Sequence, residues 1–395
     1  MVSYASRLDA IPPYLFGEIS RLKAKYVAEG RDLIDFGIGD PDQPTPLPII
    51  QALSEAAHDP STHRYDETDY GVPEFTYAVA EWYKRRYGVD VNPEKGEVLL
   101  LIGSKEGLAH LAWAFLDPGD IALVPDPAYT VYRNNVAMAG GKPYVMPLLE
   151  RNGFLPDLSA IPSDIAKQAK LLFVNYPNNP TAAVATREFF TDLVQFAKKN
   201  DIIICQDGAY SEVTYDGYKS PSLLETPGAM DVAVEINSLS KQFNMTGWRI
   251  GWAVGNAQVI EGLRKLKSNV DSKQFPAIAR AAAYALKNLD GSPETLALYK
   301  RRRDILIDGL NNLGWNLAKT KATLYVWVPV PSGYTSVKFA ETLLEKAGIL
   351  VVPGIGYGEH GEGFVRFSLT VSGDVNGERV AEAIERIGKN VPINR

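Results

Sequence analysis

The chain has 395 residues, a formal net charge of −6 and 46% hydrophobic residues, proportions typical of a globular protein large enough for two domains. It has no clustered basic patch and no long apolar run, so we expect neither nucleic-acid binding nor a membrane span. The start of the chain does not resemble a signal peptide, Cys205 is the single cysteine and the four histidines are scattered, so we expect a cytoplasmic protein without disulfides or a metal site.

An N-terminal helix is predicted over residues 14–29, where apolar residues recur at helical spacing and Gly30 follows. Further along, short apolar runs bounded by Gly, Pro, Asp and Asn predict strands that are buried on both faces. They lie at 97–102, 121–125, 171–175, 201–205, 232–237 and 250–254, and helix-length segments such as 104–116, 129–139 and 186–199 separate most of them. This alternation predicts an α/β domain with a mostly parallel sheet.

The pattern changes after about residue 290. A long charged helix (293–313) is followed by strand TLYVWVPV, a helix at 336–347, strands ILVVP and FVRFSLT, and a final helix. The Gly-rich stretch at 354–363 has no helical pattern after it and is predicted as a loop. We therefore expect a large α/β domain at 46–290 and a smaller α+β domain formed by 1–45 and 291–395.

Polar side chains follow four of the predicted strands, in the segments GSKEG, NYPNNPT, QDGAY and NSLSK. Ligands of open α/β sheets bind beyond such strand ends. Ser104 begins a helix there, where backbone N–H groups can bind a phosphate, although a plain N-cap without a ligand explains it equally well. Asp207 is either a helix cap or the partner of a buried cation. A lysine in a polar loop, such as Lys241, is ordinarily a solvated charge. The serines and the arginine near it in the sequence, however, could bind a phosphate, which favours a functional role.

The motifs NNPT, D-x-x-Y, S-x-S-K and GWRIG, in this order, resemble those of the fold-type-I pyridoxal-phosphate aminotransferases of class I and II. The resemblance runs from FGIGDPDQPTP to FVRFSLT, and it implies a seven-stranded, mostly parallel sheet in the large domain. The segments LIGSKEGLAH, LVPDPAYTVYR, SLSKQFNMTGWRIG and YGEHGEG are most similar to the LL-diaminopimelate aminotransferases. The resemblance therefore implies an enzyme that moves an amino group from an amino acid to a 2-oxo acid.

The resemblance also implies a role for individual residues. Lys241 would carry pyridoxal 5'-phosphate as a Schiff base and move the substrate Cα proton. Asp207 would keep the ring nitrogen of the cofactor protonated, and Arg366 would bind the substrate α-carboxylate through its planar fork. The other implied contacts are Tyr129 on the ring face, Asn179 and Tyr210 on the ring hydroxyl oxygen, Ser104, Lys105, Ser238 and Arg249 on the phosphate, and Gly39 with Asn179 beside the substrate.

The resemblance further implies a homodimer, because the family builds each active site from two subunits. Tyr65, or its neighbour Tyr70, would reach the phosphate of the partner's cofactor. The loop at 65–71 is one residue longer than in the family, and we expect its acids Glu67 and Asp69 to recognise the distal ammonium of diaminopimelate.

Another departure is Ala182, which stands where the family has glycine. We expect a slight local rearrangement there, with backbone strain if the residue adopts a positive φ.

The substrate and the reaction class leave alternatives open. LL-diaminopimelate with 2-oxoglutarate is favoured, but alanine, aspartate or glutamate becomes the donor if the loop turns away from the site. A carbon–sulfur lyase or an acyl-CoA condensing enzyme remains possible within the fold. Residues 238–241 satisfy the S-x-x-K pattern of serine acylases, although K-T-G and S-D-N are absent. A non-catalytic effector-binding protein with this fold would normally carry a DNA-binding domain as well, for which the chain has no spare residues.

Overall fold

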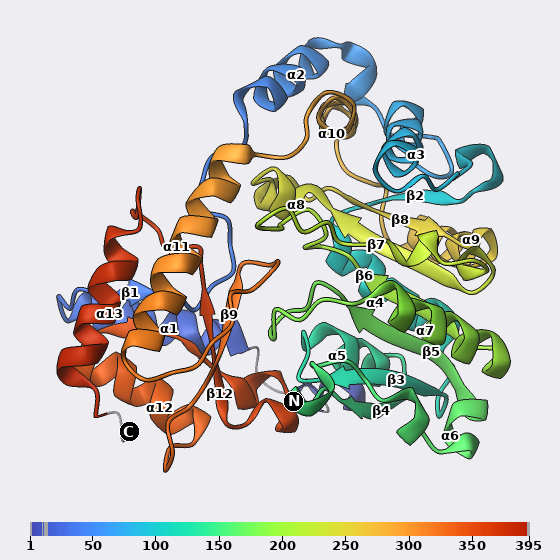
Figure 1. Cartoon of the computed structure of the whole chain (residues 1–395). Coiled ribbons are helices and arrows are strands. Elements are labelled where there is room, and N and C mark those ends of the chain that lie inside the picture. Colours follow the sequence, from blue (N-terminus) through green and yellow to red (C-terminus); the bar gives the residue numbers. More distant parts are fainter. Residues whose placement is uncertain (1, 10, 12–14, 393–395) are drawn as a thin grey trace.

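The computed structural model describes the chain except residues 1, 10, 12–14 and 393–395, and only the backbone of 15–20 and 22. Two groups of elements lie side by side, a large sheet with its helices and a smaller body that contains α1, α11 and α13 (Figure 1). The predicted N-terminal helix is α1 (Leu15–Ala28), and position 14 of that prediction lies outside the described residues.

The large sheet has seven strands, and only β8 runs against the direction of the others. This confirms the mostly parallel seven-stranded sheet. One edge strand, β4, was not among the predicted runs because its side chains are largely exposed or half-buried. The strand order is β2 (Val98–Leu101), β8 (Gly251–Gly255), β7 (Ala233–Ser238), β6 (Ile203–Asp207), β5 (Ala169–Asn175), β3 (Ile121–Asp126) and β4 (Lys142–Pro147).

Helices cover both faces of this sheet, so its strands other than the edge strand β4 are buried on both sides, as their apolar runs predicted. The helices α4 (Ser104–Phe115), α5 (Val131–Met138) and α9 (Ala257–Val270) share one hydrophobic cluster with the sheet. The helices α3 (Pro73–Tyr87), α7 (Arg187–Asn200) and α10 (Pro276–Asn288) share the other. At the top of Figure 1, α2 (Leu47–His58) packs against α10.

The smaller body has its own hydrophobic cluster. A three-stranded antiparallel sheet has the order β11 (Val352–Pro353), β12 (Phe364–Ser368) and β9 (Tyr325–Pro329). The short strand β1 (Ile34–Asp35) pairs in parallel with β10 (Ile349–Leu350), which joins the beginning of the chain to its end.

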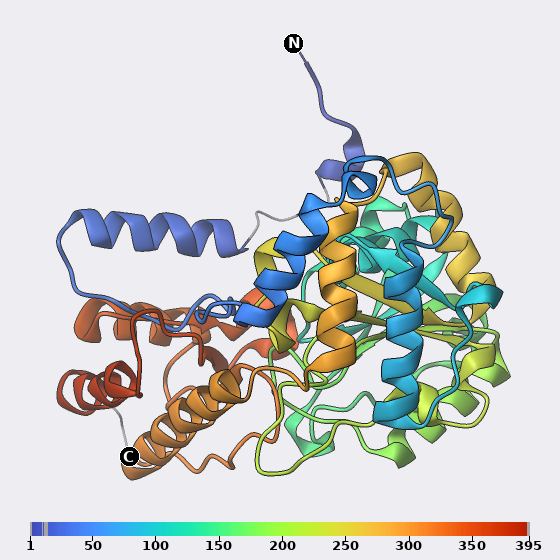
Figure 2. The same ribbon diagram turned by 90° about the horizontal axis from the view of Figure 1, so that it is seen from above.

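The helices α11 (Pro293–Asn312), α12 (Ser336–Thr342), which continues as a π-helical turn at Leu343–Ala347, and α13 (Glu378–Asn390) complete the smaller body. Figure 2 shows α1 extending along this body, away from the large sheet. In the part of the chain that the structure describes, no helix combines the length and the apolar character needed to cross a bilayer.

Candidate active site

A cavity of about 320 Å³ lies at the carboxyl ends of β5, β6 and β7 and is closed from the other side by residues of β9 and β12. It brings together the cofactor and substrate residues expected from the sequence, except those of the loop at 65–71, Tyr65, Glu67 and Asp69. The residues brought together are Gly39, Ser104, Lys105, Tyr129, Asn179, Asp207, Tyr210, Ser238, Lys241, Arg249 and Arg366.

Lys241 lies in the single turn α8 (Leu239–Gln242), which directly follows β7 and places its side chain in the cavity. The turn begins at Ser238, whose hydroxyl accepts a hydrogen bond from the Ser240 N–H. The Lys241 ammonium donates to the Gly39 carbonyl over 2.7 Å. Desolvation lowers the pKa of Lys241 to about 8, against the opposing charge of Asp40. A substantial fraction of this amine is therefore neutral, and nucleophilic, in mildly alkaline solution.

Asp207 ends β6 and is 5% exposed. Burial raises the pKa of Asp207 to about 6, although the Tyr132 hydroxyl donates to the carboxylate over 2.7 Å. Within the described residues, no cationic side chain forms an ion pair with Asp207. A cationic group that entered the cavity beside this carboxylate would hold it ionised.

Arg366 comes from β12 and is wholly buried. Its guanidinium donates to Asn179 Oδ1 over 2.8 Å and to the Gly37 carbonyl over 2.7 Å. The guanidinium carbon lies 4.1 Å from the centre of the Tyr325 ring, whose hydroxyl is 2.7 Å from that of Tyr210. A planar guanidinium held in this way is suited to bind a carboxylate bidentately.

A second cationic part of the cavity, which we call the cationic corner, lies at the beginning of α4. The N-cap is Gly103, with φ +74, so Ser104 is the first helical residue and not the cap that one alternative expected. A Cβ atom on Gly103 would lie 2.2 Å from Arg249 Nη2, so only glycine allows the guanidinium to approach this turn. Helix N-termini bind anions through backbone N–H groups and the helix dipole. The cationic corner, with Lys105 and Ser238 also lining it, is suited to a phosphate.

The loop at 65–71 does not line the cavity of its own chain. Tyr65 is 79% exposed, and Glu67 is exposed as well. Tyr70 donates a hydrogen bond to Glu261 of the same chain over 3.0 Å, which argues against a reach to a partner's site. Asp69 forms an ion pair with Arg264 of the same chain, at 3.0 Å.

Ala182 has φ +59, the left-handed conformation in which an alanine carries strain. Its N–H donates to the Asn178 carbonyl over 3.0 Å, so the turn after the NNPT motif forms in spite of the missing glycine.

Tyr132, Asn175 and Tyr325 are among the residues of the cavity that were not predicted. Tyr132 bonds Asp207, as described above. Asn175 binds the Asp207 carbonyl over 2.8 Å and accepts from the Asn179 N–H over 2.8 Å, and its place at the end of a buried strand could have identified it. Tyr132 and Tyr325 lie within apolar patterns typical of core aromatic residues, so no local signal distinguished them.

The sequence pattern of the aminotransferase class I and II family matches residues 31–387. The LL-diaminopimelate aminotransferase of Moorella thermoacetica is 55% identical over 97% of each chain. Among solved structures, apo-BacF from Bacillus subtilis has a TM-score of 0.93, with 39% identity over 100% of each chain. A mutant aspartate aminotransferase of Thermus thermophilus has a TM-score of 0.88, with 31% identity over 98% of this chain and 100% of its own. The chain therefore belongs to the class I and II aminotransferases and is itself an aminotransferase.

Proposed function

We propose that this aminotransferase moves an amino group from LL-diaminopimelate to 2-oxoglutarate, with pyridoxal 5'-phosphate bound in the cavity around Lys241. The observation that carries the proposal is the meeting, in one cavity, of a lysine with a lowered pKa, a buried carboxylate and a buried arginine. The choice of substrate is supported by the 55% identity to a relative of that name.

The residues of the cavity fit this cofactor. Pyridoxal phosphate has a basic ring nitrogen at one side and a phosphate at the other. Asp207 is a buried carboxylate without a cationic partner among the described residues, and Gly103 leaves the space in which Arg249 meets the first turn of α4. The bound cofactor supplies an electron sink for the bond between the substrate Cα and its proton.

The side chains of the cavity then have separate tasks. Lys241 Nζ would hold the cofactor and, once the substrate amine had displaced it as a free neutral amine, would accept the Cα proton and return it. Asp207 would keep a proton on the ring nitrogen, and Tyr129 would cover the ring and exclude water. The remaining contacts would be those of Asn179 and Tyr210 with the ring oxygen, and those of Ser104, Lys105, Ser238 and Arg249 with the phosphate.

Arg366 binds the substrate α-carboxylate, assisted by the backbone at Gly39. We propose a homodimer in which the partner subunit contributes two residues to the site. Tyr65 of the partner subunit would bind the phosphate, and Glu67 of the partner subunit would bind the distal end of the substrate. Both side chains are exposed, and neither lines the cavity of its own chain. The loop is held in this position by Lys273, whose ammonium lies 3.3 Å from the Asp66 carboxylate.

A plainer donor is the second candidate. Neither Glu67 nor Asp69 lines the cavity of its own chain, and Asp69 is engaged with Arg264. Without an acidic partner at the far end of the cavity, a distal ammonium would be buried at a large cost in free energy. Aspartate, alanine or glutamate would then be the better donor.

We also propose that the chain forms a large cofactor-binding domain at 46–290 and a small domain at 1–45 and 291–395. The separate hydrophobic clusters of the two parts support this division. Tyr210, Val213 and Tyr215 pack into the cluster of the small part and so join the two.

The test is a comparison of amino donors with the purified, cofactor-loaded protein. LL-diaminopimelate, alanine and aspartate are each offered with 2-oxoglutarate, and the glutamate formed is measured. We expect kcat/KM for LL-diaminopimelate to exceed the other two by a factor of about 100 or more, since a site built for polar groups discriminates strongly. A preference for alanine or aspartate would overturn the proposed substrate and leave the aminotransferase class standing.

A further inference from the structure

The connection between β1 and α2, residues 36–46, forms one wall of the cavity, and we call it the wall segment. Two of its carbonyls bind the two cations to which the proposed function gives the central tasks. Gly39 accepts from Lys241 and Gly37 accepts from Arg366, each over 2.7 Å. A shift of the wall segment therefore changes the surroundings of both cations together.

The first half of the wall segment is fixed by the chain that runs through and beyond β12. The Ser368 N–H donates to the Phe36 carbonyl over 2.8 Å, and the Thr370 hydroxyl donates to the Ile38 carbonyl over 2.6 Å. Arg366 belongs to the same strand, so this side of the wall is aligned with the arginine that it contacts.

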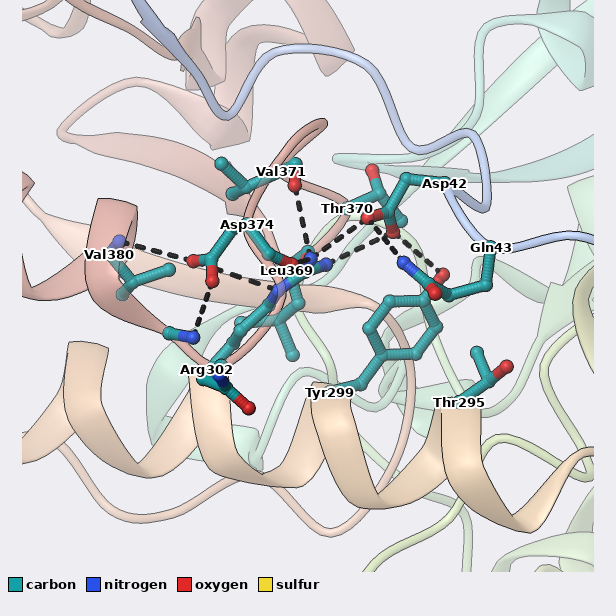
Figure 3. A network of polar contacts seen from close by, with 12 residues as sticks. Asp42, Gln43, Thr295, Tyr299, Arg302, Leu369, Thr370, Val371, Asp374 and Val380 are labelled. Carbon is teal, nitrogen blue, oxygen red and sulfur yellow. Dashed lines mark hydrogen bonds and ion pairs between the residues drawn. The ribbon is translucent and has the colours of Figure 1, made fainter.

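The second half is fixed at Asp42, whose side chain is 5% exposed. Arg302 of α11 binds this carboxylate with both terminal nitrogens, Nη1 to Oδ1 over 3.0 Å and Nη2 to Oδ2 over 2.8 Å (Figure 3). The Tyr299 hydroxyl, one helical turn earlier, donates to Asp42 Oδ1 over 3.1 Å.

The same guanidinium also holds the chain that follows β12. Arg302 is wholly buried and donates to the carbonyls of Leu369, Val371 and Asp374. Figure 3 shows the guanidinium between this chain and Asp42. One side chain thus aligns the wall segment with the strand that carries Arg366.

A buried ion pair of this kind contributes little net stability, because both charges lose their hydration. Its geometry is nevertheless restrictive, since a guanidinium fork fixes the distance and the plane of a carboxylate. A lysine would keep the charge but could not bind Asp42 bidentately and reach the three carbonyls as well.

We propose that Arg302 and Asp42 are positioning residues that set the wall segment against Lys241 and Arg366 and thereby determine the affinity for the substrate carboxylate. This inference rests on the proposed function, in which Arg366 binds that carboxylate. Neither residue contacts the substrate itself in this account.

The test compares Arg302→Lys with Arg303→Lys. Arg303 is the next residue of α11, is equally buried, and binds Asp304, Asp216 and the Thr320 carbonyl without contact to the wall segment. In Arg302→Lys we expect the KM for the amino donor and for the 2-oxo acid to rise about tenfold, because a small misplacement weakens an oriented contact. We expect kcat to change less than about threefold and the affinity for the cofactor to stay the same. Arg303→Lys should show wild-type KM values.

Two further measurements do not depend on turnover. Hydrogen exchange of the peptide that covers residues 36–45 should accelerate in Arg302→Lys and not in Arg303→Lys, and the dissociation constant of 2-oxoglutarate, measured by calorimetry, should rise with KM. If Arg302→Lys does not fold, Asp42→Asn, which keeps the shape of the carboxylate, replaces it with the same expectations. Equal KM values and equal exchange in the variant and its control would overturn the inference. Absence of aminotransfer in the wild-type protein would instead contradict the proposed function, and the exchange and calorimetric measurements would still decide this inference.

Discussion

The Tyr132 hydroxyl donates a 2.7 Å hydrogen bond to Asp207 Oδ2, which joins the beginning of α5 to the end of β6 beneath the cavity. The tyrosine ring stacks on Phe173, with ring centres 5.4 Å apart, so the hydroxyl is held in place by packing. Within the described residues, this carboxylate has hydrogen-bond donors but no cation beside it. The Asp207 carboxylate is therefore suited to bind a cationic group of a ligand.

The first prediction concerns turnover in Asp207→Asn. The amide keeps the shape of the side chain but removes the charge that would hold a proton on the cofactor ring nitrogen. We expect kcat to fall by about two orders of magnitude or more, as for the loss of other preorganised charges at active sites. Steady-state kinetics at saturating cofactor measure it, and near-normal kcat would rule out this role for Asp207.

The second prediction concerns the stability of the cofactor-free protein. The pKa of Asp207 is raised from 3.8 to about 6 by burial. Because the folded state favours the protonated form, the stability that Asp207 contributes is complete below pH 3.8 and is lost as the pH rises through about 6.

The amide side chain introduced by Asp207→Asn is neutral at every pH. We therefore expect the cofactor-free variant to be more stable than the wild type at pH 7.5, by roughly 1–3 kcal/mol, with the difference vanishing near pH 4. Urea unfolding of both apoproteins at several pH values measures it. If the wild type were the more stable protein at pH 7.5, burial of the ionised Asp207 carboxylate would not destabilise the fold.

The third prediction concerns Tyr132→Phe, which removes one donor from Asp207 and should raise the pKa of that carboxyl further. We expect affinity for pyridoxal phosphate at neutral pH to fall about tenfold, the effect of one hydrogen bond to a charged group. Fluorescence titration of the apoprotein measures it. The control is Tyr176→Phe, where the lost hydroxyl bonds the Phe154 carbonyl, and an equal loss in both variants would contradict a specific effect on Asp207.

The fourth prediction concerns the proposed dimer. When Tyr65→Phe and Lys241→Ala proteins exchange subunits, a hybrid should contain one site with both defects and one with neither. We expect activity well above that of either variant alone. If labelled subunits demonstrably exchange and no activity returns, Tyr65 does not serve the partner's site.

The strand-end residues of the site could be predicted because a parallel sheet brings the carboxyl ends of its strands to one edge. Asp207 and Lys241 follow buried apolar runs, and their place in the chain was enough to put them together. Arg366 and Gly39 come from distant parts of the chain, and only the family resemblance connected them with this edge.

Other features depend on contacts that no local pattern contains. Tyr132 and Tyr325 differ from core aromatic residues only in the hydrogen-bond partners of their hydroxyls. The position of the loop at 65–71 depends on Arg264 and Lys273, about 200 residues later in the sequence. The distal part of the substrate site could not be predicted for the same reason, since the loop residues expected there lie outside the cavity of their own chain.

The most direct test of the account is to identify the lysine that holds the cofactor. The protein is loaded with pyridoxal phosphate, reduced with borohydride and digested, and the labelled peptide is sequenced by mass spectrometry. We predict a label on Lys241 alone, while Lys241→Ala should still bind the cofactor reversibly through Asp207 and Arg249. A label on Lys105, the other lysine that lines the cavity, would contradict the assignment of the whole site.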